Sequence, residues 1–299
     1  MLIALLSLLA CNGTDTDTDT DTDTDTDTAA AGCASDAPEL RSVSLSGVRL
    51  DYACQGTGPT VLMLHGFPEF WMGWSQVMSQ LSTDYRVVAP DQRGYNTSDK
   101  PDGVESYVLD LLVADIDELI DVLGGPVVLV GHDWGGAVAW AVASRHPEQV
   151  ERLVILNAPH MNVFADELEN NPEQADAFSY VNFFISEGSE DVLAANDFAL
   201  LAGTLGDALD EEELSAYREA WGQPGALTGG LNWYRANFDE DGLPVVTEAL
   251  EVSVPTLVMW GMDDTALLPS NLDGLPEYVD DLQIIEVEGA THWIAHEVP

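Results

Sequence analysis

A glycine-rich turn between two apolar segments constrains the fold of this chain most strongly. Val127–Val130 is a strand-like, β-branched run, and a helix of small residues is expected from Gly135 to about Arg145. Between them lies Gly131–Gly136 (GHDWGG). Small residues on both sides of a central residue are needed where a strand meets a helix in a strained turn with closely packed backbones. The pattern therefore predicts that Asp133 projects above a sheet at the start of a helix.

Strand-like and helix-like segments alternate through most of the chain. Short apolar runs are typical of strands buried on both faces. They occupy Val61–Leu64, Tyr85–Ala89, Leu153–Leu156, Thr256–Trp260 and Gln283–Val287. Ser42–Ala53 has the pattern of a hairpin, and Val104–Leu123 has apolar residues at helical spacing. The sequence predicts an α/β fold with a mostly parallel central sheet and helices on both faces.

Residues 160–245 interrupt this alternation. They are helix-like, and between Met161 and Tyr217 they contain fourteen acidic residues and no basic one. In open α/β sheets, functional sites collect at the carboxyl ends of the strands, and an insertion leaving the sheet there would cover the site. We expect residues 37–159 and 246–299 to form the core and residues 160–245 to form a helical lid.

The charge of the chain excludes two classes of partner. There are 53 acidic and 9 basic residues, which gives a formal net charge of −44. Nucleic acids and anionic membrane surfaces both require a basic footprint. Without the Thr-Asp repeat at residues 14–28 the net charge is still −37, so the folded part is itself acidic. We interpret this as a solvated surface, and we expect no metal ion because no EF-hand loop or His/Cys ligand cluster is present.

The N-terminal residues have the pattern of a targeting signal followed by a tether. Residues 1–10 are apolar except for Ser7, too short to span a bilayer, and the right size for the apolar region of a signal peptide. Leu8–Cys11 resembles a bacterial lipobox, in which Cys11 would carry the lipid. We expect residues 1–11 to be this signal and residues 12–36 to be a disordered linker. The chain is then an exported, membrane-anchored lipoprotein; the alternative is a cytoplasmic protein with a stray apolar start.

The redox state of two further cysteines depends on the compartment in which the protein resides. In an oxidising compartment Cys33 and Cys54 could form a disulfide that pins the start of the domain. In a reducing one they would be two free thiols. The sequence leaves both readings open.

The central residue of the turn decides the chemistry. A serine there would form acyl-enzymes, whereas a carboxylate such as Asp133 attacks a saturated carbon and forms an alkyl-enzyme ester. The alternative role for Asp133 is a helix N-cap. The flanking glycines favour the role of nucleophile for Asp133.

A base is needed to hydrolyse such an ester. His292 follows the last predicted strand and Asp264 follows the strand before it. The order nucleophile, acid, histidine is that of α/β hydrolases, and the acid would orient the imidazole. Asp263 competes with Asp264 for this role. His296 lies in the tail, where a surface histidine is expected.

An early loop offers hydrogen-bond donors. His65, Gly66, Phe67 and Pro68 follow the first of the short apolar strands. The backbone N–H groups of Phe67 and Trp134 are predicted to form an oxyanion hole. An ordinary strand-to-helix turn is the alternative, and the proline is a candidate for a cis peptide bond.

With these motifs identified, the chain resembles the epoxide hydrolases of the α/β-hydrolase fold from about Val43 onward. The matching stretches are His65–Trp74, Asp91–Pro101, Gly131–Gly136, Leu231–Arg235, Trp260–Asp264 and Gly289–Trp293. The resemblance implies an α/β-hydrolase fold with a lid and conversion of an epoxide and water to a vicinal diol, with no cofactor. It also implies a closing helix after His292, where only seven residues follow, so we expect a shortened end.

The resemblance also implies two lid tyrosines that donate protons to the epoxide oxygen. Tyr234 lies in Leu231–Arg235 (LNWYR), and Tyr180 lies in an aromatic segment early in the lid. Two phenols suit this role because ring opening develops an alkoxide. The alternative is that both are core aromatic residues.

Three functions remain open at this point. The first is an epoxide hydrolase acting on a neutral, apolar small molecule, because the lid has no basic residue before Arg218. The second is a haloalkane dehalogenase with the same Asp-His-Asp triad. The third is a non-catalytic binding protein on a hydrolase fold. A membrane is expected as a partner only through the lipid anchor.

Overall fold

A computed structural model describes residues 32–34, 36–245 and 248–299. The predicted signal peptide, the lipidation site Cys11 and nearly all of the Thr-Asp linker lie outside these residues. In the described part of the chain, no helix has the length and apolar character needed to cross a bilayer.

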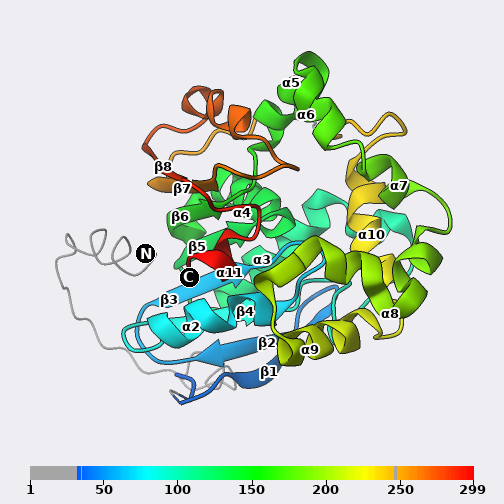
Figure 1. Cartoon of the computed structure of the whole chain (residues 1–299). Helices are drawn as coiled ribbons and strands as arrows, with labels where there is room; N and C mark the ends of the chain where they lie inside the picture. Colours follow the sequence, from blue (N-terminus) through cyan, green and yellow to red (C-terminus); the bar gives the residue numbers. More distant parts are fainter. Residues whose placement is uncertain (1–31, 35, 246–247) are drawn as a thin grey trace.

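The described strands form one mostly parallel sheet, as predicted (Figure 1). Their order across the sheet is β1-β2-β4-β3-β5-β6-β7-β8, and only the β1–β2 and β2–β4 pairs are antiparallel. The strands are β1 (Glu39–Ser44), β2 (Arg49–Gln55), β3 (Thr60–Leu64), β4 (Arg86–Pro90), β5 (Val127–His132), β6 (Val150–Leu156), β7 (Thr256–Gly261) and β8 (Leu282–Val287). Every residue of β4, β5 and β7 is buried, which explains their continuous apolar runs.

Helices cover both faces of the sheet, and each face has its own apolar cluster. On one face pack α2 (Ser75–Leu81) and the short C-terminal α11 (Ile294–Glu297). On the other pack α3 (Leu109–Leu123) and α4 (Trp134–Arg145). The short 3₁₀ helices are η1 (Trp71–Trp74), η2 (Val104–Tyr107), η3 (Pro147–Gln149), η4 (Gly206–Ala208), η5 (Pro269–Leu272) and η6 (Leu275–Glu277).

The single helix predicted over Val104–Leu123 is wrong, because it is broken at Val108. This residue is extended, with φ −64° and ψ 146°, between η2 and α3. The lid satisfies the backbone groups freed there: the Asn237 side chain donates to the carbonyl of Tyr107 and accepts from the N–H of Leu109. The break therefore depends on a residue far away in the sequence, which helical periodicity cannot reveal.

The lid lies between β6 and β7 in the sequence. Its helices are α5 (Met161–Asn170), α6 (Pro172–Ala177), α7 (Val181–Ile185), α8 (Ser189–Leu205), α9 (Glu211–Trp221) and α10 (Ala226–Asn237). Of these, α7 to α10 gather at one side of the sheet (Figure 1). Helix α8 is kinked, because Asn196, Asp197 and Phe198 have positive φ.

The start of the described chain is fixed to β2. Cys33 and Cys54 form a disulfide with a Cα–Cα distance of 5.7 Å. The N–H of Cys33 donates to the carbonyl of Gly56, and the N–H of Gly56 donates to that of Ala34. The predicted linker end at residue 36 is therefore too late, since residues 32–34 are already held by the domain.

Candidate active site

The strand-to-helix turn places Asp133 as the sequence predicts. Asp133 connects β5 to α4 with φ 51° and ψ −123°, a strained conformation for a residue other than glycine. The turn leaves no room for neighbouring side chains. A Cβ on Gly135 would lie 2.1 Å from the carbonyl oxygen of Leu64, and one on Gly66 would lie 2.2 Å from Oδ1 of Asp133. The glycines therefore permit the close approach that exposes the carboxylate.

The parallel register brings the other predicted residues to the same edge of the sheet. Leu64 of β3 pairs with Gly131 of β5, and Gly261 of β7 pairs with Val287 of β8. The carboxyl ends of these strands consequently lie side by side. The segments that follow them carry the predicted oxyanion loop, nucleophile, acid and histidine.

His292 lies between two carboxylates. Its Nε2 is 3.7 Å from Oδ2 of Asp133, and its Nδ1 is 2.8 Å from Oδ2 of Asp264. Asp263 is exposed, and the structure gives its carboxylate no contact with the imidazole. The geometry therefore selects Asp264 over Asp263 as the partner of His292.

Asp264 is itself held by groups that the sequence analysis missed. Its Oδ2 accepts a hydrogen bond of 2.8 Å from the side chain of Asn157, and its Oδ1 accepts from the N–H groups of Ala266 and Leu267. Asn157 directly follows β6 and has φ 38°. An asparagine just after a buried strand, where a left-handed conformation is needed, was the available signal.

The electrostatics of this pair favour an imidazolium in the free site. Burial lowers the pKa of His292, but the carboxylate of Asp264 and then that of Asp133 outweigh burial and raise it to about 9. Burial also raises the pKa of Asp264, yet His292 outweighs it and holds this pKa below its usual value. Each group therefore stabilises the charged form of the other.

The early loop is in contact with the nucleophile. The N–H of Phe67 donates to Oδ1 of Asp133 at 2.8 Å. Trp134 is the first residue of α4, where backbone N–H groups have no partner within the helix. The Phe67–Pro68 peptide bond is cis. His65 is buried with its pKa lowered by burial to about 4, so it remains neutral.

Both predicted lid tyrosines face the nucleophile, from different parts of the lid. Tyr180 precedes α7 and Tyr234 lies in α10, and both line a cavity together with Asp133. The ring of Phe184 packs between them, with centroids 5.2 Å from Tyr180 and 5.0 Å from Tyr234. Burial, and then the charge of Asp133, raises the pKa of both phenols well above its usual value. Their hydroxyls therefore keep their protons.

A cavity of about 880 Å³ opens above Asp133 and His292. Its lid side is mostly apolar. Tyr180, Thr204, Gly206 and Tyr234 line it together with the apolar residues Phe183, Phe184, Leu193, Leu200, Leu201, Leu205 and Ala208. Among the described residues there is no group of three or more His, Cys, Asp or Glu that could hold a metal ion. The site is thus an apolar pocket with a few polar groups at its base, the usual form of a small-molecule site.

A buried polar cluster beside the site was not predicted. Glu69 contacts Nδ1 of His132 at 3.1 Å and Nε2 of His296 at 2.6 Å, and the hydroxyl of Tyr217 donates to it at 3.1 Å. The expectation of a surface position for His296 is wrong, because its side chain is only 4% exposed. His132 also contacts the carbonyl oxygen of His292 at 2.8 Å. The cluster therefore joins the lid, the turn and the histidine segment.

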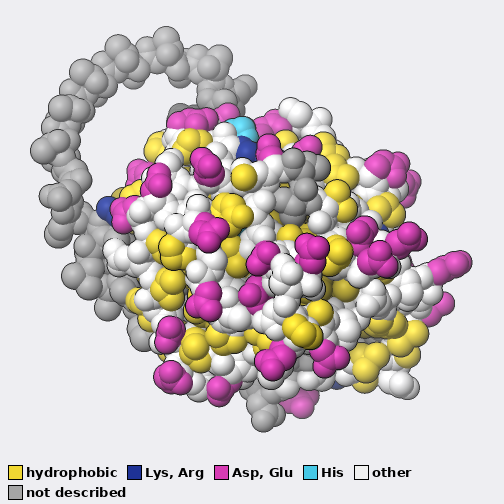
Figure 2. Space-filling model, turned by 90° about the horizontal axis from the view of Figure 1, so that it is seen from above, with side chains coloured by type: hydrophobic (Ala, Val, Ile, Leu, Met, Phe, Trp, Pro, Cys, Tyr) yellow, Lys and Arg dark blue, Asp and Glu magenta, His cyan; other side chains and the backbone are white. Residues whose placement is uncertain are grey.

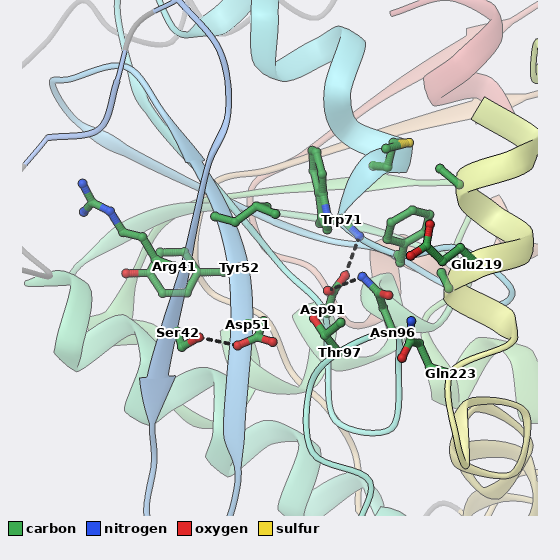
Figure 3. Close-up of a pocket in the computed structure, with 15 residues that line it drawn as sticks. Arg41, Ser42, Asp51, Tyr52, Trp71, Asp91, Asn96, Thr97, Glu219 and Gln223 are labelled. Atoms are coloured by element: carbon green, nitrogen blue, oxygen red, sulfur yellow. Dashed lines mark hydrogen bonds between the residues drawn. The ribbon is translucent and has the colours of Figure 1, made fainter. Parts of the chain in front are cut away.

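A second cavity, of about 350 Å³, lies between the β1–β2 hairpin and α9 (Figure 3). None of the predicted catalytic residues lines it. Its buried carboxyl, Asp91, accepts hydrogen bonds from the N–H of Trp71 and the side chain of Asn96. Burial raises the pKa of Asp91 to about 7. These bonds hold two loops together, and we assign the chemistry to the larger cavity.

Comparisons with known proteins agree with this geometry. Residues 59–299 match the family model of the alpha/beta hydrolase fold. The chain is 40% identical to AB hydrolase superfamily protein YfhM of Bacillus subtilis (strain 168), over 88% of this chain and 95% of that protein. It is 38% identical to Epoxide hydrolase 4 of Mus musculus, over 85% of this chain and 74% of that protein.

Solved structures give the same answer. A mutant of an epoxide hydrolase from Bacillus megaterium superimposes with a TM-score of 0.82 and 35% identity, over 87% of this chain and 95% of that one. The fold, the strand-to-helix turn at Asp133 and the sequence similarity therefore indicate the same family. The chain belongs to the α/β hydrolase family and is epoxide hydrolase-like within it.

Proposed function

We propose that this protein hydrolyses a neutral, apolar epoxide to a vicinal diol through a covalent ester on Asp133. The observation that carries the proposal is the position of Asp133. Its carboxylate faces two protonated phenols in an apolar cavity and is 3.7 Å from the imidazole of His292. The epoxide hydrolases among its relatives support the same assignment.

In the first half of the reaction, Asp133 attacks one carbon of the epoxide ring. A C–O bond to the carboxylate forms as the ring C–O bond breaks, and its electrons go to the epoxide oxygen. Tyr180 and Tyr234 donate hydrogen bonds to this developing alkoxide, and one phenol transfers its proton. The apolar lid excludes water, which strengthens these interactions.

In the second half, water attacks the ester. Nε2 of His292 takes a proton from the water, whose oxygen adds to the carbonyl carbon of the Asp133 ester. The N–H groups of Phe67 and Trp134 stabilise the resulting oxyanion. The tetrahedral intermediate then collapses as the ester C–O bond breaks, and the proton of the added hydroxyl goes to the leaving alkoxide, which releases the diol and the Asp133 carboxylate. The proton held by His292 returns to the tyrosinate formed in the first half. Asp264 holds the imidazole and stabilises its charged form.

The charges of the site favour this order of steps. Asp133 helps to raise the pKa of His292 while it is a carboxylate. Formation of the ester removes that charge, so the pKa of His292 falls in the intermediate. The change favours the neutral imidazole, the form that can accept a proton, at the stage where water must be activated.

The proposal is tested by incubating the purified protein with styrene oxide and, separately, with a primary bromoalkane. We expect diol from the epoxide, no bromide release, and no diol from the Asp133→Ala variant. Bromide release without diol would instead assign a haloalkane dehalogenase. Epoxide binding without either product would indicate a binding protein.

We also propose that the chain is exported as a lipoprotein. The disulfide between Cys33 and Cys54 supports this, because such bonds persist in oxidising compartments. Labelling of cells with a radioactive fatty acid tests it. Label should appear in the protein and be lost in Cys11→Ser.

A further inference from the structure

The cavity above Asp133 has a strongly unbalanced charge. None of the described residues that line it is Lys or Arg. Among the described residues, four carboxylates line it: Asp133, Asp263, Asp264 and Glu297. Of the described residues that line the cavity, only His292 can carry a positive charge, and it already contacts Asp133 and Asp264.

Three of these carboxylates have partners. Asp133 and Asp264 flank His292. Glu297 accepts hydrogen bonds of 2.7 Å from both the N–H and the hydroxyl of Thr291. Asp263 differs, because it is exposed and its carboxylate has no hydrogen bond or ion pair with any described residue. Among the described residues that line the cavity, Asp263 is therefore the one carboxylate whose charge is available to a ligand.

The surroundings do not offset this charge. The first basic residues of the lid are already paired: Arg218 lies 3.1 Å from Asp197, and Arg235 lies 2.6 Å from Glu190. Figure 2 shows one face of the molecule, where Asp and Glu side chains are widely spread and Lys and Arg are few. A ligand approaching the cavity therefore meets a negative potential.

We propose that the site selects epoxides by charge, preferring those with a cationic, ammonium-bearing tail that Asp263 contacts. This rests on the epoxide hydrolysis of the proposed function and differs from it in the substrate, because the preferred molecule has an apolar epoxide end and a positively charged tail. The two phenols and the apolar lid side hold the epoxide beside Asp133, and about 880 Å³ leaves room for a tail that reaches Asp263. Aromatic walls that include Phe183 and Trp293 also accept organic cations. A carboxylate tail would be repelled by the same groups.

The test uses three phenyl glycidyl ethers that differ only in the para substituent: aminomethyl, hydroxymethyl and carboxylate. At neutral pH these are cationic, neutral and anionic. We expect kcat/KM to fall in that order, by about three- to fivefold per step at low ionic strength, the size of an exposed ion pair. The differences should shrink as salt is added.

Two variants locate the effect. In Asp263→Asn, the ratio of kcat/KM for the cationic and neutral epoxides should fall about threefold. In the matched control Asp273→Asn, which removes an exposed carboxylate that does not line the cavity, the ratio should not change. The use of a ratio separates charge recognition from any general loss of activity.

The outcomes are distinguishable. Diol formation with equal kcat/KM for all three epoxides would overturn the charge selection but leave the proposed function intact. A preference that is the same in Asp263→Asn would overturn the role of Asp263. Absence of diol from all three epoxides would overturn the proposed function itself.

Discussion

Asp133 owes its exposure to neighbouring residues that lack side chains. There is no room for a Cβ at Gly66 or at Gly135, and Asp133 has a strained backbone conformation close to both. The pattern of small residues is local in the sequence, so it could be recognised without a structure. The pairing of His292 with Asp264 depends instead on which of two adjacent carboxylates is buried.

The raised pKa of His292 gives a test at this scale. In the resting protein the imidazole should titrate with a pKa of about 9, because Asp264 and Asp133 favour its charged form. Asp264→Asn should move this titration to lower pH. NMR of the ring of His292 as a function of pH measures both, and a pKa near the usual 6.5 in the unaltered protein would contradict the account.

This shift also has a consequence for stability. A pKa that is higher in the folded state stabilises the protein fully below the unfolded value of 6.5. The contribution is lost as pH rises towards 9. The free energy of unfolding, measured with urea, should therefore decrease as pH rises through this range. The decrease should be smaller in Asp264→Asn.

At the scale of elements, Glu69 links three parts of the fold. It joins Tyr217 of α9, His132 at the end of β5 and His296 of α11. Burial raises the pKa of Glu69, but its bonds with both histidines hold it well below its usual value. Lid and core are therefore joined through a buried charge.

Glu69→Gln should accordingly destabilise the protein. The amide keeps the size of the side chain but removes the charge that the two histidines face. We expect a loss of about 3 kcal/mol in the free energy of unfolding, typical of breaking a buried ion pair. Glu286→Gln, on the exposed side of β8, is the control and should change little. Equal stability of the two variants would show that the cluster is not a structural link.

The buried strands could be predicted from the sequence better than the helix break and the buried polar cluster. The buried strands were recognised because both of their faces are apolar, and their ends differ from the expected ones by only a few residues. The break at Val108 and the Glu69 cluster depend on Asn237, Tyr217 and His296, which lie far away in the sequence. Such contacts leave no periodicity in the segments that they shape.

At the scale of the whole molecule, the dominant feature is mutual repulsion among carboxylates. The formal net charge of −44 could be read directly from the sequence. The size of the cavity and the free state of Asp263 could not, because they depend on how the lid packs. Repulsion of this kind lowers the stability of the compact state and is screened by salt.

Added sodium chloride should therefore stabilise the protein. Between low and high ionic strength we expect Tm to rise by roughly 3 °C or more, equivalent to about 1 kcal/mol for a domain of this size. Differential scanning calorimetry measures this directly. A Tm that is constant or falls with salt would show that the surface charges are already neutralised by their neighbours.

The central claim is that Asp133 forms a covalent ester, and mass spectrometry tests it most directly. In His292→Ala the ester should form but not be hydrolysed. After incubation with styrene oxide, the variant should gain the mass of one intact epoxide, and peptide mapping should place it on Asp133. The double variant Asp133→Ala, His292→Ala should gain none. No adduct, or an adduct on another residue, would contradict the mechanism.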